Sequence, residues 1–212
     1  GEVAVSGGPP RCLPVGALDV VAPVMDRIVD LEWARDHVIA NLSFTGALLT
    51  LTPSVQIAEG AGPGGEASGV LTVRQPEVPG SLSVTRVPVQ VDPSTIAYLK
   101  DAVWVDRPSK LFQNLLVTTI RERTGRLVLD DVESRAASDS VLRGTLREFG
   151  YDARSGAVVV TYDAIRENGG KLQTRRFTAR VPGVPAEASP VGVALNDAAN
   201  QVAIDVADWI GR

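Results

Sequence analysis

The fold is decided by three successive stretches: VLRGTLREFGY at residues 141–151, AVVVTYDAIR at 157–166 and LQTRRFTARV at 172–181. Apolar and polar side chains largely alternate along these stretches, which is the period of a β-strand with one buried face. The two connections between them, residues 152–156 and 168–170, are short and contain glycine. Short glycine-containing connections favour hairpins, so the sequence predicts three strands in an antiparallel meander.

Two stretches outside the meander have helical spacing instead. Apolar residues recur every three or four positions along 110–124 and 190–210, and each stretch therefore predicts an amphipathic helix with one stripe to bury. We expect Ser109 to cap the first helix and Gly125 to end it. Both helices must cover an apolar surface, and the meander offers one.

The rest of the chain adds shorter strands and an N-terminal extension. Strands are expected at residues 47–52, 70–73, 83–91, 95–99 and 126–129. The sequence thus predicts an α+β fold: a two-layer sandwich of a mixed, mostly antiparallel sheet with two main helices packed on one face.

We place a domain boundary between residues 46 and 47. Residues 1–46 form an N-terminal extension, in which a glycine- and proline-rich loop precedes an expected helix at 17–40. Residues 47–212 form the main domain.

Composition excludes several classes of function. The 212 residues include 21 Lys and Arg against 25 Asp and Glu, a formal net charge of −4, which argues against a nucleic-acid-binding protein. One cysteine excludes an intrachain disulfide and a Cys-rich zinc site, and one histidine excludes a multi-His metal centre. We therefore expect no cofactor, no metal and no nucleic-acid partner.

Catalytic motifs are weak throughout. Residues 60–65 (GAGPGG) match the G-x-G-x-x-G pattern, but a strand is expected after them, where a dinucleotide site needs a helix. His37 has no polar cluster near it in sequence, and the acidic run Asp130, Asp131 and Glu133 is typical of a solvated strand exit. We expect no enzyme, although a pocket that joined these groups would reopen that interpretation.

Four further residues are candidates for a functional role. Cys12 is either the site of a lipid anchor or an incidental loop thiol, because the residues before it (Gly-Pro-Pro-Arg) do not fit a lipoprotein signal. Tyr98, Trp104 and Pro108 precede the first main helix. They form either a partner-contact motif or a structural one, in which Trp104 joins the sheet to the helix.

Three segments, taken in order, resemble a known family. They are Tyr98 with Ala102-x-Trp104, Pro108 and the leucines 111, 115 and 116; the run Leu142-Arg143-Gly144-Thr145-Leu146-Arg147-Glu148-Phe149; and the ending Ala207-Asp208-Trp209-Ile210. Over residues 47–212 they resemble the ABC-type transport auxiliary lipoproteins, the small proteins encoded with MCE-domain transporters (PqiC-like and LinN-like proteins).

This resemblance implies a non-enzymatic auxiliary subunit in the periplasm or at the outer membrane of a bacterium. Its implied partners are an MCE-domain protein and the permease and ATPase of an ABC system that moves lipids or other hydrophobic compounds. Homo-oligomer formation and direct lipid contact stay open.

The first residues depart from the family pattern, since about thirty-five residues separate Cys12 from Leu48. The alternative function is a periplasmic carrier that holds an apolar ligand between helices and sheet.

Overall fold

The computed structural model describes residues 46–55, 69–130 and 140–211. The chain divides into two units, residues 1–44 and 45–212, and all described residues belong to the second. The helix expected at 17–40, Cys12 and His37 lie outside the described ranges, as do the glycine-rich residues 60–65 and the acidic residues 131 and 133.

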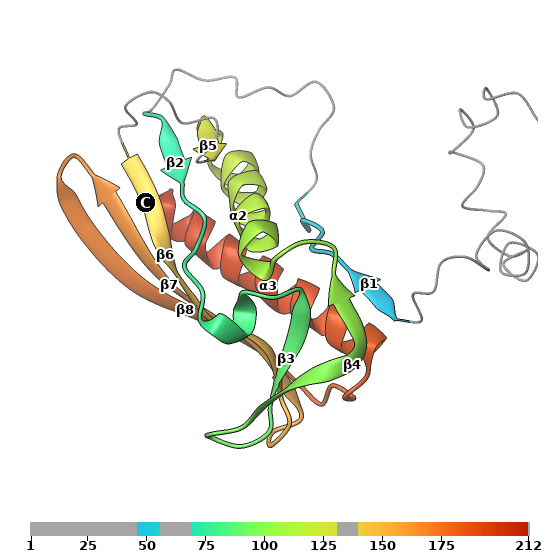
Figure 1. Cartoon of the computed structure of the whole chain (residues 1–212). Coiled ribbons are helices and arrows are strands. Elements are labelled where there is room, and N and C mark those ends of the chain that lie inside the picture. The colour runs from blue at the N-terminus through green and yellow to red at the C-terminus, as the bar shows by residue number, and fades with distance from the viewer. Residues whose placement is uncertain (1–45, 56–68, 131–139, 212) are drawn as a thin grey trace, which may run out of the picture. The chain divides into compact units, whose positions relative to one another are not determined.

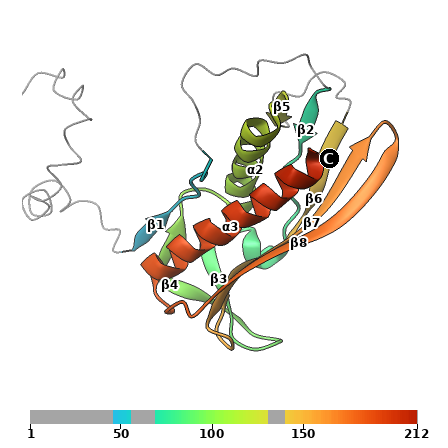
Figure 2. The ribbon, with the colours of Figure 1, turned by 180° about the vertical axis from the view of Figure 1, so that it is seen from behind.

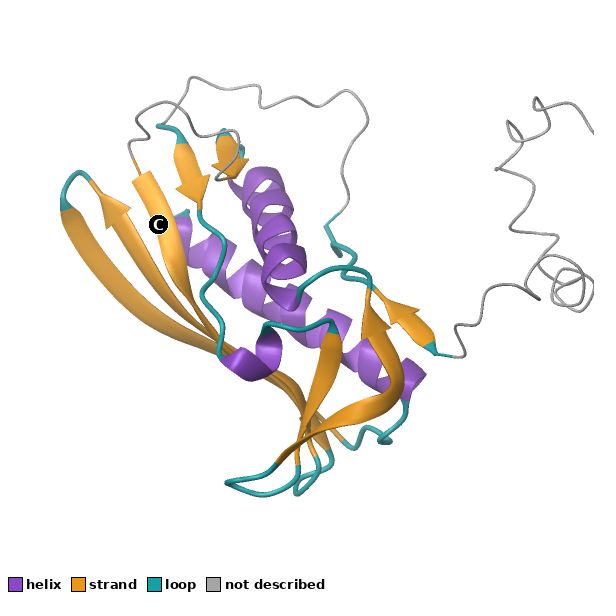
Figure 3. Ribbon diagram, viewed as in Figure 1, coloured by secondary structure: helices purple, strands orange, loops and turns teal. Residues whose placement is uncertain are grey.

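Eight strands and two α-helices make up the described part of the chain (Figures 1 and 3). In chain order they are β1 (Ala47–Leu49), β2 (Leu71–Val73), a 3-10 turn η3 (Gly80–Leu82), β3 (Arg86–Gln90), β4 (Ile96–Trp104), α2 (Pro108–Thr124), β5 (Val128–Asp130), β6 (Ser140–Asp152), β7 (Ala157–Asn168), β8 (Lys171–Pro182) and α3 (Ala188–Ile210). The predicted α+β sandwich, with two main helices and a mixed sheet, is confirmed.

Strand β6 is the centre of the sheet. It pairs antiparallel with β7 along almost its whole length, and β7 pairs antiparallel with β8, as the meander predicts. The other side of β6 is shared: its first residues pair parallel with β2, and its last residues pair parallel with β3. Beyond these, β5 joins β2, and β4 and then β1 join β3.

The buried face of β6 explains the spacing of its apolar residues. Leu142, Leu146 and Phe149 are all at most 1% exposed, although Leu146 and Phe149 are an odd number of residues apart. A register shift between Leu146 and Glu148 compensates, because an extra residue in a β-bulge returns the next side chains to the same face. Gly144 lies beneath the Tyr162 ring, where a Cβ would lie 2.8 Å from ring carbons.

Both helices pack on the same face of the sheet, and α3 crosses it diagonally in the view of Figure 2. The core between the layers contains a series of aromatic rings. Trp104 and Phe149 have ring centroids 5.3 Å apart, Phe149 and Phe112 are 6.4 Å apart, and Phe112 and Tyr162 are 5.3 Å apart. These rings come from β4, β6, α2 and β7, so they join both layers into one core.

Three local predictions need correction. Ser109 does not cap α2: Arg107 holds the cap position, and the Ser109 hydroxyl, inside the first turn, accepts a 2.7 Å hydrogen bond from Gln75. The strand expected from residue 83 starts at Arg86, after the η3 turn. The strand expected to end at residue 99 continues to Trp104. Asp101 has a positive φ of 55°, but it lies where the register between β3 and β4 shifts, so the strand continues past it.

Candidate functional site

The sheet face opposite the two helices is the candidate site. We call it the open face, because no helix of the described chain covers it. It carries the polar side chains that alternate with the core residues on the three long strands. They are Arg143, Thr145, Arg147 and Glu148 on β6, Thr161 and Asp163 on β7, and Thr174, Arg176, Thr178 and Arg180 on β8. The apolar Ile165 of β7 lies on the same face.

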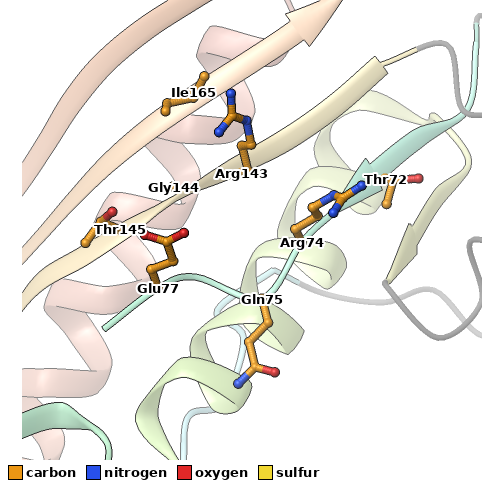
Figure 4. Close-up of a pocket in the computed structure, with 8 residues that line it drawn as sticks. All are labelled: Thr72, Arg74, Gln75, Glu77, Arg143, Gly144, Thr145 and Ile165. Atoms are coloured by element: carbon orange, nitrogen blue, oxygen red, sulfur yellow. The ribbon is translucent and has the colours of Figure 1, made fainter. Parts of the chain in front are cut away.

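The first hollow on the open face has a volume of about 620 Å³ and lies between residues 72–77 and β6 (Figure 4). Its charged lining consists of Arg74, Arg143 and Glu77, all exposed. Figure 4 shows Glu77 beside Thr145, with the two arginines further toward Thr72. We call it the Arg74–Arg143 hollow.

Backbone hydrogen bonds hold this hollow in shape. Arg74 N–H donates to the Leu142 carbonyl at 2.8 Å, and Glu77 N–H donates to the Gly144 carbonyl at 2.9 Å. The Gln75 side chain points the other way and donates to the hydroxyl of Ser109 on α2. The segment is therefore fixed to both layers, and its charged side chains project from a rigid backbone.

A second hollow, of about 570 Å³, runs across the open face from the β3–β4 hairpin to β8. Beside it Asp163 accepts hydrogen bonds from two of its lining arginines: Arg176 Nε at 2.6 Å and Nη2 at 2.8 Å, and Arg147 Nε at 3.0 Å. The paired hydrogen bonds from Arg176 and the further one from Arg147 stabilise the ionised carboxylate. They lower the pKa of Asp163 to about 2, although partial burial acts in the opposite direction.

Two smaller polar groups continue this hollow. Thr161 donates to Glu148 at 2.6 Å and lies 3.3 Å from the Thr178 hydroxyl. Arg180 on β8 pairs with Asp152 at 3.4 Å. The open face is thus an ordered array of charges that pair across three strands, bordered on the hairpin side by the half-exposed Ile96.

The residues predicted from sequence lie elsewhere. Trp104 is 1% exposed and packs on Phe149, and Pro108 is buried in the first turn of α2. Only Tyr98 reaches the surface in part, where the Arg86 guanidinium lies 4.7 Å from its ring centroid. The structure does not bring the three together on one surface, and their role in partner contact stays a prediction.

Sequence reasoning missed most of the open-face residues. The alternation along residues 141–151 already places Arg143, Thr145 and Arg147 on one side. That pattern marks them as polar, but it does not show that Asp163 lies opposite Arg176, because cross-strand register is not visible in the sequence.

Among the described residues, no group of three or more His, Cys, Asp or Glu residues could hold a metal ion. Within the same residues, no helix has both the length and the apolar character needed to span a membrane.

The fold and its open face define a small α+β domain in which the described helices leave one charged sheet face uncovered. Comparison with known proteins gives its family. The chain belongs to the ABC-type transport auxiliary lipoprotein components, whose family model matches residues 49–207. That description associates the chain with an ABC transport system and with a cell envelope.

Solved structures share the fold at low identity. A Xanthomonas campestris protein of the DUF330 family is 19% identical, with a TM-score of 0.65 over 78% of this chain and 94% of that one. The crystal structure of an uncharacterized protein is 21% identical, with a TM-score of 0.60 over 68% of this chain and 93% of that one. The search of curated proteins gave no match.

Proposed function

We propose that this chain is a non-enzymatic auxiliary subunit of an MCE-type ABC transport system. It works on the periplasmic side of a bacterial envelope, where the system moves lipids or other hydrophobic compounds. The observation that carries the proposal is the family match over residues 49–207, which spans nearly the whole described sandwich. In this role the chain binds the MCE-domain protein or the permease and ATPase subunits and leaves transport chemistry to them.

The open face is the proposed docking surface. Arg74 and Arg143 are exposed and form no ion pair with the described residues, so their charges are available to an acidic partner surface. Their backbone is held by β6, and a preorganised surface loses little conformational entropy on association. A charged surface of this kind favours specific and fast docking over high affinity.

A role without catalysis is consistent with the state of two aspartates beside the second hollow, Asp163 and Asp152. Asp163 is held by two arginines that lower its pKa to about 2, far below the range useful for proton transfer near neutral pH. Asp152 accepts a hydrogen bond from the Ser155 hydroxyl and pairs with Arg180, and these contacts lower its pKa as well. These carboxylates stay ionised and structural.

A lipid anchor at Cys12 belongs to the same proposal. The family consists of lipoprotein components, and this is the one cysteine of the sequence. An acylated Cys12 would hold the domain at a membrane surface, with the outer membrane as the proposed location, through the long segment that precedes residue 47.

Cross-linking tests the docking role. Tagged full-length chain is cross-linked in bacterial envelopes, and the MCE protein, permease and ATPase are quantified by mass spectrometry. We expect Arg74→Glu/Arg143→Glu to lose most of the recovery. The control Lys100→Glu/Arg107→Glu makes the same charge change at exposed positions that line neither open-face hollow, and it should retain the recovery.

Two outcomes would contradict different parts of the proposal. If unmodified chain recovers no MCE or ABC component, the transport role is wrong. If both double variants recover the partners equally, the role stands but the open face is not the docking surface.

No observation favours the alternative carrier function over this one. The core residues between the helices and the sheet are mostly 0–2% exposed, so side chains fill that space. Native mass spectrometry after mild extraction would decide, since a bound lipid would support the carrier.

A further inference from the structure

A third hollow lies at one end of the sandwich, away from the open-face hollows. It has a volume of about 830 Å³ and is lined by the last residues of α2, α3 and β7. Three arginines line it (Arg123, Arg126 and Arg166), with Asp208 as the carboxylate among its lining residues. We call it the C-terminal hollow.

The carboxylate of this hollow, Asp208, already has an arginine partner. Asp208 accepts hydrogen bonds from Arg123, at 2.9 Å from Nε and 2.7 Å from Nη2. Across the described ranges, no carboxylate lies within ion-pair distance of Arg126 or Arg166. The hollow therefore contains two guanidinium charges that the described residues do not neutralise.

Donor atoms of these two arginines also lack acceptors. The Nε atoms of both Arg126 and Arg166 are buried without a hydrogen-bond partner in the described structure. Arg126 Nη2 makes one long contact, 3.5 Å, to the Gly69 carbonyl. A buried donor without an acceptor costs free energy, so a ligand that supplies oxygens here would be stabilised.

The electrostatics favour the same ligand. Burial lowers the pKa of Arg166, and the charge of Arg126 lowers it further. Arginine nevertheless stays protonated at neutral pH, so the two like charges repel. The carbonyl ends of α2 and α3 offset only part of this repulsion, since a helix C-terminus carries only about half a negative charge.

We propose that the C-terminal hollow binds a phosphate-type oxyanion through Arg126 and Arg166. Guanidinium groups match phosphate oxygens with paired, charge-assisted hydrogen bonds. The hollow opens to solvent and is larger than a phosphate group, so the anion can be free or can be the headgroup of a lipid. The proposal does not depend on the docking role.

Phosphate titration tests the site. Inorganic phosphate is added to the ¹⁵N-labelled full chain at constant ionic strength, with chloride as the reference, and the arginine Nε–H signals are followed by NMR. We expect saturable shifts at Arg126 and Arg166. Arg126→Gln and Arg166→Gln should each weaken binding about tenfold or more, as expected for loss of a charged hydrogen bond.

Two further variants serve as controls. Arg154→Gln removes the same charge at an exposed turn between β6 and β7 and should bind phosphate like the unmodified chain. Arg126→Lys keeps the charge but loses the paired guanidinium donors, so its affinity for phosphate should lie between those of the unmodified chain and Arg126→Gln. It also provides a test if a glutamine variant fails to fold by circular dichroism.

A vesicle arm identifies the source of the anion. Flotation compares phosphatidylcholine vesicles with vesicles that also contain phosphatidic acid. Arginine-dependent binding to phosphatidic acid supports a headgroup site, and phosphate binding alone supports a soluble anion. If neither probe binds, or binding persists in Arg126→Gln/Arg166→Gln, the proposal is overturned and the arginines serve the helix ends only. None of these outcomes bears on the cross-linking result.

Discussion

Gly144 shows how tightly single residues are constrained in this sheet. A Cβ at this position would clash with the Asp163 carbonyl oxygen, which belongs to the β7 backbone and cannot rotate away. We therefore expect Gly144→Ala to lower the free energy of unfolding by about 3 kcal/mol, the upper range for overpacking. Urea unfolding measures this change.

Gly80 provides the matched control for that substitution. A methyl group added there would meet no heavy atom within 4 Å, and the φ of Gly80 is not positive. Gly80→Ala should change stability by less than about 0.5 kcal/mol, the usual range for surface substitutions. Equal losses for both variants would show that the close approach at Gly144 is not what constrains the position.

Asp163 makes stability depend on pH in an acidic window. Its pKa is about 2 in the folded chain and 3.8 for an ordinary aspartate, so the unfolded chain binds the proton more readily. Its contribution is full above about pH 5 and is lost as pH falls through 3.8 toward 2. Because Arg147 and Arg176 are 58% and 65% exposed, we discount the contribution to about 1 kcal/mol.

Comparing the unmodified chain with Asp163→Asn separates the pH dependence due to Asp163 from that due to the other carboxylates. The stability difference between the two proteins, from urea unfolding, should be about 1 kcal/mol at pH 6 and close to zero near pH 2. A difference that stays constant over this range would contradict an ionic role for Asp163.

At the scale of single residues, the sequence predicts to which face of a strand a side chain points, but not which residues it contacts. The alternation places Leu142 and Leu146 on one side of their strand and Arg143, Thr145 and Arg147 on the other, and burial agrees. The Asp163 pairs and the arginines of the C-terminal hollow depend on contacts between distant segments, which no local pattern encodes.

At the scale of elements, α3 holds a segment that belongs to no strand. The Asn200 side chain donates to the Thr52 carbonyl at 2.9 Å and accepts from Ser54 N–H at 2.7 Å. Asn196, one turn earlier, accepts from Thr52 N–H at 2.8 Å. Two amide side chains thus supply the backbone partners that a neighbouring strand would otherwise provide.

We expect Asn200→Ala to release this segment from α3. The Ser54 amide loses its acceptor and the Thr52 carbonyl its donor, so stability should fall by about 1–3 kcal/mol and hydrogen exchange at Ser54 should accelerate. Hydrogen–deuterium exchange measures the second effect. Gln201→Ala is the control, because the exposed Gln201 side chain donates to Asp205 on its own helix and not to this segment. Unchanged exchange in both variants would contradict the tether.

Long periodic elements are predictable from the sequence and short ones are not. Both main helices and the three long strands lie within a few residues of their expected bounds, since each carries many repeats of one pattern. The start of β3 and the end of β4 differ from the prediction because tertiary pairing, and not propensity, determines where irregular strands begin and end.

At the scale of the whole molecule, residues 45–212 have a core of their own. Every described core residue lies between Leu49 and Ile210. The domain boundary between residues 46 and 47 stays a prediction, and it has a direct test. We expect a chain of residues 45–212 to fold cooperatively, with a thermal midpoint within a few degrees of that of the full chain, since core burial dominates stability.

Circular dichroism and calorimetry measure this outcome. A fragment without a cooperative transition would show that residues 1–44 are needed for folding. The order of strands is not predictable at this scale: periodicity identifies β2 and β3 as strands, but nothing local shows that both pair with the same side of β6.

The shared side of β6 also affects how the polypeptide folds while it is synthesised. β3 can pair with β4, and β2 with β5, as soon as those strands are made, but the two pairs are joined into one sheet only when residues 140–152 have left the ribosome, since β2 and β3 both pair there. Until then, side chains that end fully buried, such as Leu71 and Val87, have no completed layer to enter. We expect chaperones to bind this growing N-terminal portion during biosynthesis and to dissociate once β6 arrives.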